Sequence, residues 1–65
     1  MPYARDEDLP PAVQKLPRHA RDIFRAAFNN AWVEYADRGI YREEIAFRVA
    51  WAAIRRAGYS HPGDK

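Results

Sequence analysis

The side chains with the most obvious capacity for chemistry are His19 and Glu43. A histidine can serve as a general base, and it can activate a serine, threonine or cysteine beside it. The chain has a single serine, Ser60, and contains neither threonine nor cysteine. Ser60 is therefore the one hydroxyl or thiol of these types that a histidine could activate. We predict that the chain has no catalytic residue and is not an enzyme. His19 is instead expected to be a buried or half-buried structural side chain, hydrogen-bonded near Tyr59.

Glu43 could belong to a cation site, but the sequence supplies too few oxygen ligands for one. Glu43, Glu44 and Asp37 provide three carboxylates, whereas calcium takes about six to eight oxygens. The absence of cysteine also excludes a thiolate site. At helical spacing, Glu43 lies about 20° from the centre of an apolar helix face. We therefore predict no metal and no cofactor, and a structural carboxylate that accepts a hydrogen bond from the Tyr35 hydroxyl or the Trp32 indole.

Four side chains are candidates for contact with a partner: Trp32, Trp51, Asn29 and Arg25. Asn29 and Arg25 are predicted to point away from the apolar face of their helix. Asn30 falls at its edge and is expected to bond either the short N-terminal helix or the extended segment before it. Trp32 and Trp51 are predicted on one aromatic flank, where tryptophan is a typical hot spot for binding. We expect the N-terminal helix to cover this flank; the alternative is contact with a partner or a second copy.

Two long amphipathic helices must position these side chains. From residue 18 to 38 apolar residues recur every three or four positions, a spacing that fits a helix and no strand. A second helix is predicted over 42–57, and Gly39 and Gly58 follow the two helices as left-handed C′ residues. The short connection at 40–41 predicts an antiparallel helical hairpin. Its seam is expected to run along four small side chains: Ala27, Ala31, Ala50 and Ala53.

A short helix is predicted ahead of the hairpin, with Asp8 as its N-cap and prolines in its first turn. Its apolar side chains would pack on the hairpin; they are Leu9, Val13 and Leu16. The predicted fold is thus all-α, a short N-terminal helix packed on a long antiparallel helical hairpin, and we also consider a minor extended pairing of Tyr3 with Tyr59. We expect residues 1–59 to form a single domain and residues 60–65 a flexible C-terminal tail.

The charge pattern gives only a weak electrostatic signal. Eleven Lys and Arg residues oppose nine Asp and Glu residues, for a net charge of +2, and the two signs are interleaved. The densest cationic spots are Arg18 with Arg21 and Arg25, and Arg55 with Arg56, which is less than the basic stripe of a typical nucleic-acid domain. No apolar run approaches the roughly 18 residues of a membrane span. We therefore expect no membrane insertion and a cytoplasmic location.

Short motifs along nearly the whole chain carry a resemblance to a known family. In chain order they are Met1-Pro2-Tyr3, Asp8-Leu9-Pro10, Leu16-Pro17 with His19-Ala20, Ala27-Phe28-Asn29 with Ala31-Trp32, and Val49-Ala50-Trp51-Ala52-Ala53. In this order they resemble the ChaB family. The resemblance implies a mostly helical regulator of a cation/proton antiporter, with the cytoplasmic face of the antiporter as the partner.

Residues and resemblance together lead to one functional hypothesis and one alternative. The hypothesis is a small non-enzymatic regulatory or adaptor protein that acts through protein–protein contact, as a monomer or a weak homodimer. The alternative is a small helical nucleic-acid-binding protein. Salt separates the two, because affinity for a duplex falls steeply as phosphate counterions are released.

Overall fold

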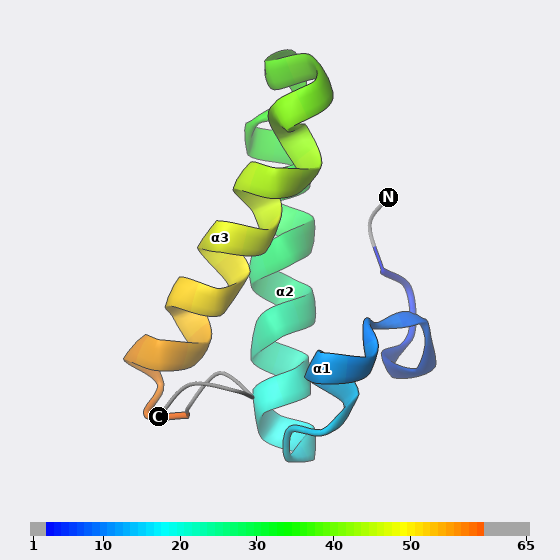
Figure 1. Ribbon diagram of the computed structural model, residues 1–65, viewed down its shortest axis with the longest axis vertical. Helices are drawn as coiled ribbons and strands as arrows, with labels where there is room; N and C mark the ends of the chain where they lie inside the picture. Colours follow the sequence, from blue (N-terminus) through cyan, green and yellow to red (C-terminus); the bar gives the residue numbers. More distant parts are fainter. Residues whose placement is uncertain (1–2, 60–65) are drawn as a thin grey trace.

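The computed structural model describes residues 3–59, which form three α-helices and two short 3₁₀ helices (Figure 1). In chain order these elements are η1 (Asp6–Asp8), α1 (Pro11–Gln14), α2 (Arg18–Glu34), η2 (Ala36–Tyr41) and α3 (Arg42–Arg56). No strand occurs within this range. The predicted all-α class is therefore confirmed, whereas the tail predicted at 60–65 lies outside the described residues.

The core lies where α2 and α3 pack side by side, running in opposite directions (Figure 1). Its largest side chains are Phe24 and Phe28 of α2, both fully buried. Small side chains on both helices let the backbones approach closely; the buried ones are Ala20, Ala31, Ala46 and Ala50. Ala27 and Ala53, which we had placed in the seam, are only half-buried. Positions 20, 24, 28 and 31 centre the buried face of α2 on Phe24 rather than on Ala27.

The short helix α1 depends on its contacts with the core. With only four residues it could not be stable alone. The three apolar side chains predicted to anchor it are all buried; they are Leu9, Val13 and Leu16. The predicted cap is wrong: Pro10 occupies the N-cap position, and Asp8 ends η1 and pairs with Arg5. An N-cap at Asp8 would need N–H groups from residues 10 and 11, and both are prolines.

The helix α2 ends at Glu34, four residues before the predicted Arg38. The chain then tightens into η2, in which the Arg38 N–H donates to the Tyr35 carbonyl oxygen. Gly39, predicted as the C′ residue of α2, does have a positive φ of 59°, but it lies inside η2 and reverses the chain there. The positive φ was therefore anticipated, whereas the 3₁₀ geometry before it was not.

The end of α3 follows the predicted pattern closely. Gly58 has a φ of 95°, and its N–H donates to the Arg55 carbonyl oxygen. The next N–H, of Tyr59, donates to the Ile54 carbonyl oxygen at 3.1 Å. These two bonds form a Schellman motif, which satisfies carbonyls that the helix end would otherwise leave unpaired. The motif brings Tyr59 back toward the start of α2.

Candidate functional site

Among residues 3–59, the side chains with catalytic potential do not assemble into a reactive centre. The His19 ring lies 6.4 Å from the Tyr59 ring, centroid to centroid, which is the neighbour we predicted. The predicted burial is wrong, because His19 is exposed at the start of α2. Within residues 3–59, no three His, Cys, Asp or Glu side chains gather closely enough to hold a metal ion. The described part of the chain therefore gives no geometric basis for acid–base or metal chemistry.

Glu43 does not make the hydrogen bond predicted for it. It is exposed in the first turn of α3, and among the described residues its carboxylate bonds neither Tyr35 nor Trp32. Arginines contact these two aromatic rings instead. The Arg38 guanidinium lies 5.7 Å from the centroid of the Tyr35 ring, and the Arg42 guanidinium lies 4.0 Å from the centroid of the Trp32 ring. These cation–π contacts leave the Glu43 carboxylate facing solvent.

Three polar side chains on one stripe of α2 bind the backbone of the N-terminal region. They stand at positions 21, 25 and 29, so they lie one above another on the helix. Arg21 donates to the Leu16 carbonyl oxygen at 2.7 Å, and Arg25 donates to that of Ala4 at 3.3 Å. We call this set, Arg21, Arg25 and Asn29, the clamp. Through these bonds to backbone oxygens it fixes the path of residues 3–16.

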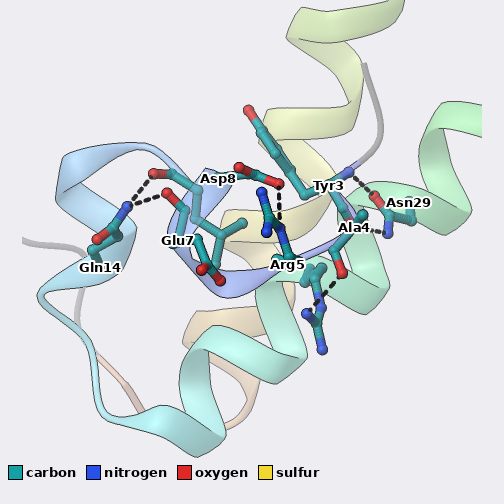
Figure 2. Close-up of polar contacts among 9 residues, drawn as sticks. Tyr3, Ala4, Arg5, Glu7, Asp8, Gln14 and Asn29 are labelled. Atoms are coloured by element: carbon teal, nitrogen blue, oxygen red, sulfur yellow. Dashed lines mark hydrogen bonds and ion pairs between the residues drawn. The ribbon is translucent and has the colours of Figure 1, made fainter.

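Asn29 makes the most complete contact of the clamp, as Figure 2 shows. Its Oδ1 accepts from the Tyr3 N–H and its Nδ2 donates to the Tyr3 carbonyl oxygen, both at 2.8 Å. We predicted such a contact for Asn30, and that prediction is wrong, since Asn30 is exposed. It is also Asn29, rather than Tyr59, that pairs with the backbone of Tyr3. The Tyr59 N–H is bonded within its own helix end, so the predicted extended pairing is absent.

The clamp holds Tyr3 against the core. The Tyr3 ring lies 4.8 Å from that of Phe28, centroid to centroid. Burial, and to a smaller extent the negative charge of Glu43, raises the pKa of the Tyr3 hydroxyl above its ordinary value. The N-terminal segment thus closes over a side of the core that α2 and α3 alone would leave open.

The two tryptophans lie half-buried at the edge of an aromatic cluster. The Trp51 ring lies 5.1 Å from that of Phe24 in an edge-to-face contact, and the Trp32 ring lies 6.0 Å from that of Phe28. We predicted that the N-terminal helix would cover them. For Trp32 the cover comes from Arg42, whose Nε also donates to the Trp32 carbonyl oxygen at 2.6 Å. Trp51 is half-buried and lines a hollow.

This hollow runs along the outer side of α3 and has a volume of about 740 Å³. We call it the α3 groove; it is lined by Ile40, Glu43, Glu44, Phe47, Arg48, Trp51 and Arg55. Its floor is aromatic, and its charges are ordered along the helix. The acids lie at the N-terminal end of α3 and Arg55 lies at the C-terminal end, as the helix dipole favours.

A second exposed apolar region lies where α2, η2 and α3 meet. Ile40 is 89% exposed, Val33 is 73% exposed and Tyr41 is 61% exposed. We call these three residues the apolar end. Large apolar side chains so exposed are a frequent mark of contact surfaces.

The geometry defines a small helical protein in which several large apolar side chains are exposed on the described surface. Comparison with known proteins gives its family: the ChaB family model matches residues 9–64, and the chain belongs to this family. Relatives from Escherichia coli strain K12, Escherichia coli O157:H7 and Shigella flexneri are each 44% identical to it over an alignment 71 positions long. The alignment covers 100% of this chain and 93% of each relative.

Each of these relatives is named "Putative cation transport regulator ChaB", which is the name of a regulator and not of an enzyme. No solved structure matches the chain. No helix within residues 3–59 combines the length and the apolar character needed to cross a membrane.

The sequence analysis missed two of the residues that shape these surfaces. Arg21 was counted only as part of a cationic spot, and Arg42 was not singled out. The spacing of positions 21, 25 and 29 could have indicated a polar stripe. Its acceptors could not have been found, because a backbone carbonyl has the same chemistry at every residue.

Proposed function

We propose that this protein is a non-enzymatic regulator that acts by binding another protein, a cation/proton antiporter, at the cytoplasmic face of the membrane. The observation that carries the proposal is membership of a family whose relatives are named as cation transport regulators. In this scheme the chain stays outside the bilayer and changes transport by contact. The described part of the chain supports a contact role through its two apolar surfaces rather than through any reactive group.

The apolar end is the surface we assign to the antiporter. Ile40, Val33 and Tyr41 gain the most from being covered, because they are the most exposed of the large apolar side chains in residues 3–59. Trp32 lies beside this end under the Arg42 guanidinium and adds aromatic area. Such a combination of aromatic side chains and arginine is typical of the centre of a protein interface.

Arg25 and Asn29, which we also predicted to bind a partner, are less suitable for this contact. Both bond the chain's own backbone, Arg25 at Ala4 and Asn29 at Tyr3. A partner could reach these side chains only after the N-terminal segment had moved away. Their predicted role in binding therefore stays a prediction, and the first contact is assigned to the apolar end.

The same bonds make nucleic-acid binding the weaker alternative. Two of the three arginines in the densest cationic spot, Arg21 and Arg25, donate to carbonyl oxygens of the chain itself. Exposed acids alternate with the remaining bases; Glu44, for example, pairs with Arg48 at 2.6 Å. A surface of mixed sign releases few counterions from a duplex. We expect no duplex binding tighter than micromolar at physiological salt.

A binding assay on membranes tests the proposal. Purified tagged protein is incubated with membrane vesicles from cells that contain or lack the antiporter, and the bound fraction is measured at low and at physiological salt. We expect capture only with the antiporter, and little loss as salt rises, because the contact is apolar. Equal capture by both kinds of vesicle would show that the antiporter is not the partner.

A pair of variants tests the surface. Val33→Glu should abolish capture without lowering the melting temperature, since Val33 is 73% exposed in the free protein and does not line the α3 groove. Ala26→Glu is the matched control, an added charge at an exposed position of α2. Full capture of the Val33→Glu protein would show that the apolar end is not the contact surface.

A further inference from the structure

The α3 groove has an order of charges that can be matched to a specific ligand. Along α3, Glu43 and Glu44 come first, Phe47, Arg48 and Trp51 form the middle, and Arg55 comes last. A ligand that fits this groove must be apolar at its centre. It must also offer positive charge beside Glu43 and Glu44 and negative charge beside Arg55.

We propose that the α3 groove is a self-association site, in which a second copy of this chain packs its own α3 antiparallel to the first. The second copy carries the required pattern, since reversing the direction of α3 reverses the order of its charges. Setting Arg55 of one copy opposite Glu43 and Glu44 of the other places Trp51 opposite Phe47 and Arg48. Two-fold symmetry repeats each of these contacts, so the dimer contains two contacts between Arg55 and the acids and two between the aromatic centres.

The charge pair already present within α3 is compatible with this arrangement. Arg48 donates to Glu44 at 2.6 Å on the exposed side of the helix. A carboxylate can accept several hydrogen bonds, so Glu44 can hold Arg48 of its own helix and Arg55 of the second copy together. The dipoles of the two helices would also oppose each other, which is the favourable order for antiparallel neighbours.

The available area sets the strength of the association. A standard interface buries about 800 Å² on each partner, which is more than a sixth of the 4549 Å² exposed by this chain. One face of a 15-residue helix, about 22 Å long, offers less than that. The dimer is therefore weak, with a dissociation constant between micromolar and millimolar, and it forms where the protein is locally concentrated.

Charge reversal at the two ends of the groove tests the proposal by sedimentation. The wild-type chain should associate as its concentration rises from micromolar to millimolar. Arg55→Glu places a third acid beside Glu43 and Glu44 of the second copy and should weaken the dimer about tenfold or more. A double variant, Glu43→Lys with Glu44→Lys, should weaken it similarly, because two lysines then face Arg55.

The decisive measurement mixes the two variants. In a mixed pair, the lysines at 43 and 44 meet the glutamate at 55, and the unchanged Arg55 meets the unchanged acids. Association should therefore return in the mixture to about the wild-type level. In a parallel pair each position would face its own counterpart, so like charges would repel in the wild type and the mixture would associate more strongly than the wild type. Arg56→Glu is the control for Arg55→Glu. It has the same charge change in the same last turn of α3, at a residue that does not line the groove.

Circular dichroism on each variant confirms that it keeps its helices, and the mixture uses only variants that do. A wild-type chain that stays monomeric to millimolar concentration overturns the proposal. So does a mixture that stays as dissociated as its components, or an Arg56→Glu protein weakened as much as Arg55→Glu. Each of these results would leave the α3 groove without self-association.

Discussion

The neighbouring asparagines of α2 allow a direct test of the clamp. Asn29→Ala removes two hydrogen bonds to the Tyr3 backbone, both at 2.8 Å. At about 1 kcal/mol each, their loss costs about 2 kcal/mol. Alanine is the better helix former, which returns about 0.6 kcal/mol. The free energy of unfolding should therefore fall by about 1.4 kcal/mol.

Asn30→Ala is the matched control, because it makes the same substitution one position along the helix. Asn30 is exposed, so its replacement should bring only the gain in helix propensity, about 0.6 kcal/mol. For a domain of this size, 1 kcal/mol moves the melting temperature by about 4 to 8 °C. Asn29→Ala should then melt roughly 6 to 11 °C lower than the wild type, and Asn30→Ala roughly 2 to 5 °C higher.

Thermal melting followed by far-ultraviolet circular dichroism measures both shifts, and amide hydrogen exchange at Tyr3 reports the clamp itself. The Tyr3 amide should exchange faster in Asn29→Ala and at the wild-type rate in Asn30→Ala. The reasoning fails if both variants shift the melting temperature in the same direction by similar amounts. It fails equally if the Tyr3 amide is unaffected by Asn29→Ala.

Three further predictions concern the core, a helix end and high pH. Ala50→Leu should overpack the fully buried seam and cost roughly 1 to 3 kcal/mol, whereas the same change at the exposed Ala26 should cost almost nothing; urea unfolding measures both. Gly58→Ala should cost roughly 1 kcal/mol in the same assay, because a φ of 95° strains any side chain and no atom lies within 4 Å to compensate. The raised pKa of Tyr3 means that the folded state holds this proton more tightly than the unfolded state. The free energy of unfolding should therefore fall as pH rises above about 10, which urea midpoints measure. Tyr3→Phe should reduce this fall, whereas Tyr41→Phe, at an exposed site, should not. Equal effects of the two variants would show that Tyr3 is not the group responsible.

The helices were predictable because their signals are local. Apolar residues at helical spacing predict both α2 and α3, and Gly58 ends α3 with the expected positive φ. The buried anchors of the N-terminal region were also predictable from their type; they are Leu9, Val13 and Leu16. The end of α2 was not, because the tightening into η2 depends on how the chain turns at Gly39, and composition does not determine that turn.

The polar contacts were harder to predict because an error in the centre of a helix face changes which side chains are expected at its edge. We centred the buried face of α2 on Ala27, whereas the structure centres it near Phe24, about 60° away at 100° per residue. That difference moves Asn30 from about 60° to about 120° from the centre of the buried face, which accounts for its exposure, whereas Asn29 lies far from the centre in both cases. The clamp could not be predicted either. Its acceptors are backbone carbonyl oxygens, which every residue has, so the sequence does not indicate which of them are used.

The arrangement of the clamp bears on which surface can bind first. For Arg25 and Asn29 to meet a partner, the chain would have to give up three hydrogen bonds to Ala4 and Tyr3, together with the contact of Tyr3 on Phe28. The apolar end and the α3 groove need no such rearrangement, since their apolar side chains are already open to solvent or to the hollow. Binding at either should therefore leave the Tyr3 amide as protected from hydrogen exchange as in the free protein. Faster exchange at Tyr3 on partner binding would instead show that the N-terminal segment is displaced and that the partner uses the clamp.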